Sequence, residues 1–378
     1  MNVMRPWCLT LFAASVACLA FSSVQAQPQT PSERMPRKLG MPRYAHIFVI
    51  IEENHTTDQI VPNKAAPNLT RFAQQFGYSW RFYAETHPSE PNYVAMLGGD
   101  TFGIKDDDAF WCKPKITDPD CPNADRLGYV DHTVTSPSLA SQLSSHHLTW
   151  KGYFEDIPSP GSRAYRFPAD AVPGKPAALY AAKHNGFMNF KDVQADTALA
   201  QKIVGFDALD RDLASGNVPN FAHIVPNQCN DMHGLSGANV PADCDVRNGL
   251  QLVSRGDAVA GKLVAEIMNA PFWSKPENSA IVITFDENDT EHAGGHSAGC
   301  CGSDPKDANN PGGGWIPTII ITNHGPRGLT ELTPFNHYSL LRTIEDAFGI
   351  EQHLGRAADD AHKVLPMSAL FYVRPADQ

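Results

Sequence analysis

The run AHIFVII at residues 45–51 decides the fold. It is apolar and rich in β-branched residues, which is typical of a parallel strand buried on both faces of a sheet. Similar runs recur at FAHIVP (221–226), SAIVITF (279–285) and IPTIIIT (316–322). We therefore predict four buried strands spread along the chain.

Helical patterns lie between these strands. They occur at residues 66–77, 138–146, 198–216, 256–273 and 338–349. Buried strands that alternate with helices indicate an α/β fold, in which a mostly parallel central sheet has helices on both faces. Because no internal repeat or change in composition interrupts the rest of the chain, we predict that residues 43–378 form a single domain.

The N-terminus has the features of a secretory signal. Residues 1–26 run from Arg5 through an apolar stretch to Val24-Gln25-Ala26, which predicts cleavage after Ala26. The apolar stretch is shorter than the roughly 20 residues that span a bilayer, so a membrane anchor is the weaker interpretation, as is a lipid anchor at Cys18. Residues 27–42 are polar and rich in proline, which indicates a flexible lead-in. We expect an exported protein, periplasmic or extracellular, with no stable membrane span.

Cysteine use agrees with export. Cleavage after residue 26 leaves six of the eight cysteines, and an even number in an exported chain predicts disulfides. Cys112 and Cys121 are close enough to close a small loop. A bridge between the adjacent Cys300 and Cys301 would be strained, so we expect each to pair elsewhere. Cys229 is a candidate partner for one of them, in a bridge that would join two loops of the site.

Composition excludes some classes of function. The chain has 378 residues, of which 42% are hydrophobic and 19% are charged, as in an ordinary globular protein with a large core. The formal net charge of −11 argues against a surface that binds nucleic acid or an anionic membrane. It does not argue against an enzyme that concentrates positive charge in a metal site.

Polar side chains follow each predicted strand. They are Glu52 to His55 after the first run, Asn227 to His233 after the second, Asp286 to Asp289 after the third, and Asn336 and His337 after the fourth run and a turn. In sheets of this kind ligands bind beyond the carboxyl ends of the strands, so these side chains should converge on one rim. Carboxylate, amide and imidazole groups suit one or two divalent ions, whether Zn, Mn, Mg or Ca. Phosphoryl transfer is the reaction that most needs such a site.

The stretch THPSEPNYVAMLGGD at residues 86–100 places Ser89 just ahead of an apolar helical pattern. Serine is a preferred N-cap, so Ser89 has a purely structural interpretation. The same position is also favourable for a nucleophile, because the N–H groups and the dipole of a helix N-terminus attract phosphate. The two roles are compatible.

The other candidates have structural interpretations too. Glu53 and Asn54 could cap a helix, Asp231 and His233 could form a turn, and Asp286 and Glu287 could be solvated acids. His337 could lie on the surface, and Lys183 and His184 could end a helix. His292 and His296 lie in the glycine-rich stretch EHAGGHSAGCCG, which we interpret as a mobile rim with some potential to bind metal.

Several of these segments resemble one known family. The matching segments occur in family order between about residues 45 and 350. They are HIFVIIEENHTTDQI, HPSEPNYVAMLGG, YFEDIP, KHNGFMNF, HIVPNQCNDMHG, IVITFDEN and NHYSLLRTIEDAFGI. The chain resembles the bacterial secreted acid phosphatases of the phosphoesterase family, which also contains phospholipase C-type enzymes and phosphatidylinositol-phosphate phosphatases. The resemblance implies an alkaline phosphatase-like fold.

The resemblance also implies roles for individual residues. Ser89 matches the nucleophile of a Ser/Thr-x-Pro-Asn motif, in which Asn92 would contact substrate. The implied metal ligands are Glu53, Asn54, Asp231, His233, Asp286, Glu287 and His337. Lys183 and His184 look like contacts either to the phosphate or to the side chains that bind the metal. Asn54 and Glu287 stand where the wider superfamily often has Asp or His, which puts a second metal ion in doubt.

We therefore expect a secreted, metal-dependent phosphomonoesterase that acts through a phosphoserine intermediate, which a metal-activated water would hydrolyse. Its substrate would be a phosphorylated small molecule or a lipid head group. One alternative is a phosphodiesterase of the phospholipase C type, which would use the same groups on a different leaving group. Another is a non-catalytic secreted protein that only binds metal.

Overall fold

The segment predicted as the first strand lies at the centre of the sheet. In the computed structural model, which describes residues 40–289 and 297–373, β1 (His46–Glu52) belongs to a nine-stranded sheet. The strand order is β10-β2-β9-β8-β1-β7-β3-β6, and β11 pairs with β2. β1 pairs in parallel with β8 (Ser279–Phe285) on one side and with β7 (Phe221–Val225) on the other. These three strands therefore end at the same edge.

The remaining strands are β2 (Gly77–Tyr83), β3 (Trp150–Phe154), β4 (Arg166–Phe167), β5 (Tyr180–Ala181), β6 (Ile203–Val204), β9 (Trp315–Thr322), β10 (Leu329–Glu331) and β11 (Phe335–Asn336). The helices are α1 (Thr57–Ile60), α2 (Pro67–Gln75), α3 (Ser89–Gly98), α4 (Leu139–Ser145), α5 (Lys191–Ala195), α6 (Thr197–Ala200), α7 (Phe206–Ser215), α8 (Gly249–Asn269), α9 (His337–Phe348) and α10 (Ser368–Phe371). Three short 3-10 helices span Ala182–His184, Gly186–Asn189 and Gly355–Ala358.

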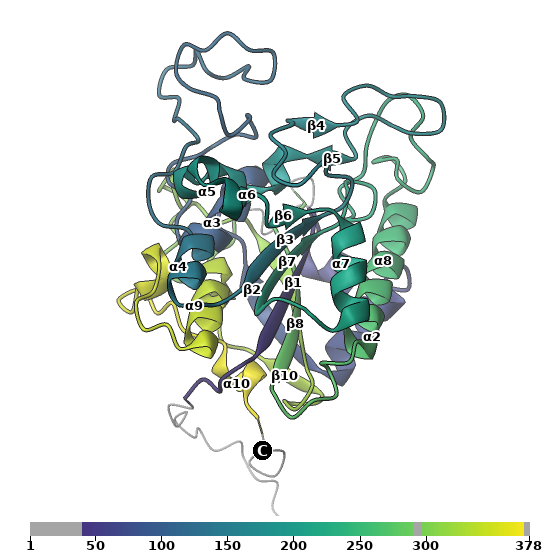
Figure 1. The fold of residues 1–378 in the computed structure, drawn as a ribbon, viewed down its shortest axis with the longest axis vertical. Coiled ribbons are helices and arrows are strands. Elements are labelled where there is room, and N and C mark those ends of the chain that lie inside the picture. Colours follow the sequence, from purple (N-terminus) through teal and green to yellow (C-terminus); the bar gives the residue numbers. More distant parts are fainter. Residues whose placement is uncertain (1–39, 290–296, 374–378) are drawn as a thin grey trace, which may run out of the picture. The chain divides into compact units, whose positions relative to one another are not determined.

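The predicted fold class is confirmed. All pairings from β8 through β1, β7 and β3 to β6 are parallel, whereas β9 runs antiparallel to both β8 and β2. In Figure 1, α2, α7 and α8 lie on one side of the sheet, and α3, α4 and α9 lie on the other. Helices therefore cover both faces, as the alternating pattern predicts.

Two predicted helices have different bounds. The pattern at 198–216 is divided into α6, the edge strand β6 and α7, because Ile203 and Val204 pair with β3 and Gly205 precedes the new helix. The helix predicted from residue 256 begins at Gly249 instead. The strands β2 and β3 were not predicted from the sequence.

The α3 helix is buried along its whole length. All ten residues from Ser89 to Gly98 are buried, and α3 contacts α9, α4 and the 3-10 helices at 182–189. A helix that is buried all round cannot shift without disturbing the core on every side. Its first residue, Ser89, is consequently held by a rigid element.

The disulfides correct two expectations. Cys112–Cys121 is confirmed, but Cys229 pairs with Cys244, and Cys300 pairs with its neighbour Cys301. The chain from Cys229 turns back on itself, and the N–H group of Leu235 donates to the carbonyl oxygen of Cys244 at 2.8 Å. This turn brings the Cα atoms of Cys229 and Cys244 to 4.8 Å, within the usual range for a disulfide. No bridge joins the two loops of the site.

The described residues, from Gly40 onward, belong to one compact unit. Within the part of the chain that the structure describes, no helix has the length and apolar character needed to cross a membrane. The proposed signal, the lead-in up to residue 39, and His292 and His296 lie outside the described residues.

Candidate active site

The ends of three neighbouring strands bring acidic residues together. The N–H group of Glu53, just after β1, donates to the carbonyl oxygen of Asp231 at 2.7 Å. The N–H group of Asp286, just after β8, donates to the carbonyl oxygen of Glu52 at 3.1 Å. All four residues are fully buried. The predicted convergence at one rim therefore occurs for the strands β1, β7 and β8.

Ser89 faces this acidic rim. It is the first residue of α3 and is 1% exposed. Its Oγ lies 3.2 Å from Glu53 Oε2 and 3.3 Å from Glu287 Oε1. Pro88, not Ser89, occupies the N-cap position of α3. The hydroxyl group therefore points at two carboxylates instead of closing the end of the helix.

Asn54 and Glu287 lie beside the same serine. The backbone N–H of Asn54 donates to Asp286 Oδ1 at 3.2 Å, and its side-chain amide donates to Glu287 Oε1 at 3.4 Å. Asn54 has a φ of 43°, in the left-handed region where asparagine is tolerated better than most residues. The imidazole of His87 contacts the other carboxylate oxygen of Glu287.

His184 lies among the carboxylates. Its Nε2 is 3.1 Å from Glu53 Oε1 and its Nδ1 is 3.4 Å from Asp231 Oδ2. The hydroxyl of Tyr93 donates to Glu53 Oε1 at 2.6 Å, and the Tyr93 ring stacks on the His184 ring. Glu53, His184 and His233 each present a ligand atom, and these atoms lie within 4.8 Å of one another. The structure thus places His184, expected at the phosphate, in a group that could hold a metal ion.

Lys183 brings a positive charge to the site. Its Nζ lies 3.1 Å from His233 Nε2 and 3.2 Å from Asp107 Oδ2. His233 Nδ1 donates to the carbonyl oxygen of Gly234 at 2.7 Å, which leaves Nε2 with its lone pair. His233 can therefore accept a hydrogen bond or bind a cation through Nε2.

Burial makes the carboxyl groups difficult to ionise. It raises the pKa of Glu53 and of Asp231 well above the ordinary range, and it raises the pKa of Asp286 to about 8. The negative charges of neighbouring acids add to this effect at Glu53 and at Asp286. Asp231 Oδ2 and Asp286 Oδ2 are buried, and neither accepts a hydrogen bond from the residues that the structure describes. Without a further cation, ionised carboxylates are therefore costly here.

The basic groups only partly offset this negative charge. Burial lowers the pKa of His184 well below its ordinary value and that of His233 to about 3, so both rings are neutral near pH 7. Burial also acts to lower the pKa of Lys183, but the Asp107 and Glu53 carboxylates outweigh it and raise that pKa. A single ammonium among several buried carboxylates fits a site that takes up a divalent cation.

Two of the expected site residues have other contacts. His337 Nε2 donates to the carbonyl oxygen of Phe285 at 2.9 Å, and the His337 backbone N–H donates to Glu85 Oε1 at 3.0 Å. The Asn92 amide oxygen accepts from the N–H groups of Glu85 and Thr86, and its NH₂ group donates to the carbonyl oxygens of Thr86 and Pro88. None of these contacts joins the two side chains to the carboxylates near Ser89. Asn92 instead fixes the loop that leads to Ser89.

The YFEDIP segment supports the loop that carries Asp231. Asn230 donates its side-chain amide to both oxygens of Glu155, at 2.9 and 2.8 Å. The Asn227 amide donates to Asp156 Oδ2 at 2.7 Å. The two acids of this segment thus hold both ends of the turn that ends at Asp231.

Sequence reasoning missed three residues near the site. Tyr93 lies four positions after Ser89, which on a helix puts both side chains on one face, so the spacing could have identified it. His87 lies in the quoted Ser89 segment and carried no distinguishing signal. Asp107 belongs to a run of three aspartates, and a run of charges usually indicates only a solvated surface.

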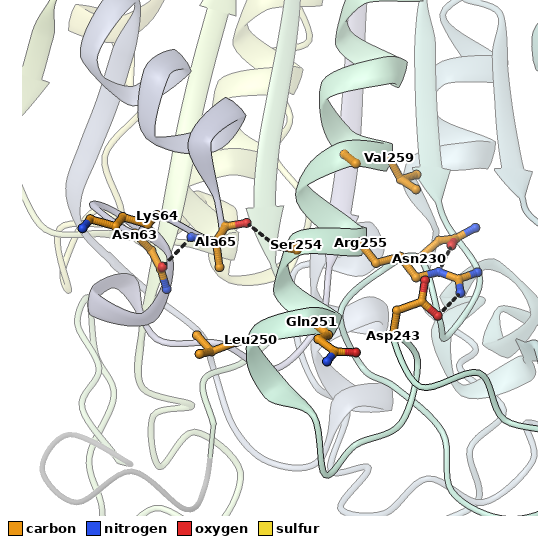
Figure 2. A pocket seen from close by; sticks show the side chains of 11 residues that line it. Asn63, Lys64, Ala65, Asn230, Asp243, Leu250, Gln251, Ser254, Arg255 and Val259 are labelled. Carbon is orange, nitrogen blue, oxygen red and sulfur yellow. Dashed lines mark hydrogen bonds and ion pairs between the residues drawn. The ribbon is translucent and has the colours of Figure 1, made fainter.

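A separate open pocket lies between residues 63–65 and α8 (Figure 2). Arg255 is one of its lining residues, with Nε 2.8 Å from Asn230 Oδ1 and Nη1 3.0 Å from Asp243 Oδ1. Neither Ser89 nor a residue of the acidic cluster lines this pocket. Asn230 does line it, but its link to the cluster is only that it precedes Asp231 in the chain. The pocket is therefore distinct from the reactive groups.

Comparison with known proteins identifies the family of this chain. The family model described as the phosphoesterase family matches residues 61–351. The chain belongs to the phosphoesterase family. It is a hydrolase that acts on phosphate ester bonds, as its sequence motifs predict.

Named relatives of this phosphoesterase are phosphatases. A phosphatidylinositol-3-phosphatase of Mycobacterium tuberculosis is 29% identical over 90% of this chain and 88% of its own length. A phosphate-repressible acid phosphatase of Penicillium chrysogenum is 26% identical over 88% of this chain, and an acid phosphatase of Aspergillus niger is 24% identical over 90%. The matches span only 64% and 66% of these two fungal proteins.

Among solved structures, the lipoteichoic acid synthase LtaP of Listeria monocytogenes aligns with a TM-score of 0.51 at 11% identity. The alignment covers 89% of this chain and 78% of that protein, so the two share a fold. A Vibrio parahaemolyticus protein of the alkaline phosphatase superfamily aligns with a TM-score of 0.49 at 11% identity, over 82% of this chain and 67% of that protein.

Proposed function

We propose that this phosphoesterase is an exported, metal-dependent phosphomonoesterase that forms a phosphoserine intermediate on Ser89. The position of Ser89 Oγ carries the proposal. It lies within 3.3 Å of two carboxylates, in a cluster that also holds an ammonium and two neutral imidazoles. This arrangement supplies a nucleophile, groups that accept its proton, and groups that can hold a cation and a phosphate.

The residues present fit a divalent metal ion. Glu53, His184 and His233 would hold one ion through oxygen and nitrogen atoms that already lie within 4.8 Å of one another. Asp231 Oδ2 and Asp286 Oδ2 are buried oxygens that accept no hydrogen bond from the described part of the chain, as expected of further ligands. When bound, such an ion would neutralise negative charge on the phosphate and lower the pKa of a nearby hydroxyl group.

The chain's own groups account for the two chemical steps. Ser89 Oγ loses its proton to the Glu287 carboxylate and attacks phosphorus. The bond from phosphorus to the ester oxygen breaks, and this oxygen takes a proton from water and leaves as the alcohol. Lys183 and the N–H groups at the start of α3 hold the phosphate oxygens. In the second step a water molecule attacks the phosphoserine, which breaks the bond to Ser89 Oγ and releases inorganic phosphate. Two displacements give overall retention of configuration at phosphorus.

The names of the relatives favour a monoester substrate. Acid phosphatases and a phosphatidylinositol-3-phosphatase would remove a terminal phosphate from a small molecule or from a lipid head group. A panel that contains 4-nitrophenyl phosphate and its bis-ester separates this activity from that of a phospholipase C-type diesterase. Preference for the bis-ester would contradict the proposal.

A pair of serine variants tests the role of Ser89. Ser138 is the N-cap of α4, and its Oγ accepts from the Ser141 N–H at 3.2 Å. Ser138→Ala should lower stability by about 1 kcal/mol and leave kcat unchanged. Ser89→Ala should abolish turnover of 4-nitrophenyl phosphate while the thermal midpoint and the metal content stay near those of the wild type. Near-normal turnover in Ser89→Ala would remove Ser89 from the mechanism.

Export is the remaining part of the proposal. Three disulfides suit an oxidising compartment. N-terminal sequencing of the protein secreted by its host should find Gln27 as the first residue. An intact N-terminus on protein that remains inside the cell would contradict it.

A further inference from the structure

The Asp107 carboxylate bridges two groups at the start of the α3 helix. Its Oδ1 accepts from the backbone N–H of Glu90 at 3.1 Å, and its Oδ2 lies 3.2 Å from Lys183 Nζ. Glu90 immediately follows Ser89, so this N–H belongs to the first turn of the helix that carries the nucleophile. Lys183 is the ammonium of the acidic cluster.

These two donors are the ones that a phosphate on Ser89 would use. N–H groups of a first helical turn bind anionic oxygens, and an ammonium group binds phosphate as a point charge. We propose that Asp107 occupies the place of the substrate phosphate and must be displaced when phosphate binds. The carboxylate thus lowers the affinity for substrate and for the product, inorganic phosphate. This inference rests on the proposed function of Ser89.

Neighbouring contacts hold Asp107 in this place. His132 is 1% exposed and connects two carboxylates, with Nδ1 2.8 Å from Glu90 Oε1 and Nε2 2.9 Å from Asp106 Oδ1. The amide of Asn189 also donates to Glu90 Oε1, at 2.6 Å. The loop is thus fixed to Glu90 of α3 through His132 and Asp106, directly next to Asp107.

The Asp107 side chain itself can leave. It is 29% exposed, whereas the groups that anchor its loop are almost fully buried. Among the described residues, turning the carboxylate into solvent breaks the hydrogen bond with the Glu90 N–H and the contact with Lys183, and phosphate oxygens can replace both. When phosphate departs, the carboxylate returns to the same donors. Product release is thereby favoured.

A pair of loop variants tests the competition. Asp107→Asn keeps an oxygen for the Glu90 N–H but removes the charge that attracts Lys183. Asp125→Asn removes the same charge from an exposed position on the same loop. Inorganic phosphate is titrated as a competitive inhibitor of 4-nitrophenyl phosphate hydrolysis by the metal-loaded proteins. The KM of the ester is measured in parallel.

We expect Asp107→Asn to lower the inhibition constant of phosphate about fivefold, with a parallel fall in KM. An effect of this size is typical of the loss of one partly exposed charge pair. Asp125→Asn should change either constant less than about twofold, because a distant exposed charge is screened. An inhibition constant that rises or stays unchanged in Asp107→Asn would overturn the inference, since Asp107 would then only orient Lys183. Failure of the Ser89 mechanism is distinguishable, because it appears as turnover in Ser89→Ala, whereas phosphate competition is measured with Ser89 in place.

Discussion

The acidic cluster should make the metal-free protein less stable than a variant in which a neutral amide replaces one of its buried carboxyl groups. Asp286 has a pKa of about 8 in the folded chain, raised by burial and by Glu287, against an ordinary value of 3.8. At pH 7 the folded chain must therefore protonate a group that is ionised in the unfolded chain. The cost is about 4 kcal/mol. It is absent below the ordinary pKa and grows as the pH rises towards 8.

Replacing Asp286 by asparagine removes this cost. The amide is neutral and of similar size, and its oxygen can still accept from the Asn54 N–H. We expect Asp286→Asn to raise the free energy of unfolding of the metal-free protein at pH 7 by about 2 kcal/mol or more. The same substitution removes a candidate metal ligand, so added metal should stabilise the variant far less than the wild type.

Urea unfolding at pH 7, with a chelator or with excess Zn or Mn, measures both effects. Asp257→Asn is the control, because Asp257 is equally buried but accepts from the N–H groups of Leu69 and Asn68 at 2.8 and 3.1 Å. It should destabilise the protein by about 1–3 kcal/mol and leave the response to metal intact. A less stable Asp286→Asn that responds to metal like the wild type would refute the reasoning.

Two further substitutions probe the surroundings of the site. Tyr93→Phe removes the hydroxyl that donates to Glu53, so metal retained after dialysis against a chelator should fall at least about tenfold, and unchanged retention would contradict this role. His132→Gln removes an imidazole whose pKa the Glu90 and Asp106 carboxylates raise to about 10 despite burial. Because that pKa is raised on folding, the stabilisation from the charged imidazole is complete below pH 6.5 and is lost as the pH rises through 10. The unfolding midpoints of wild type and variant should therefore converge over this range. A constant difference between the midpoints would contradict the prediction.

The sheet was largely predictable because a fully buried strand leaves a clear apolar run. The runs at 45–51, 221–226 and 279–285 are the adjacent parallel strands β1, β7 and β8. The run at 316–322 is equally apolar but antiparallel, since burial on both faces does not encode the direction of a strand. The strand β2 was missed because GYSWRFY mixes buried and exposed residues around a register shift.

The site was predictable where it follows directly from strand ends. Glu53 and Asp286 directly follow the paired strands β1 and β8, whereas Asp231 is placed by the turn after β7 that Glu155 and Asp156 hold. The position of His184 among the carboxylates was not predictable in this way, because it depends on a 3-10 helix that packs against α3. Asp107 lies on a long loop whose course is set by the buried His132, and no local pattern indicates that contact. The expectation that Cys300 and Cys301 pair elsewhere is wrong, because the sequence does not indicate the backbone conformation at this pair, in which Cys301 has a φ of 58°.

The phosphoserine is the most direct test of the central claim. The metal-loaded enzyme is mixed with excess 4-nitrophenyl phosphate, quenched in acid during turnover, digested and mapped by mass spectrometry. We predict one added phosphate on the peptide that contains Ser89, absent before substrate is added and absent in Ser89→Ala. Steady turnover with that peptide unmodified and another side chain phosphorylated would contradict the account.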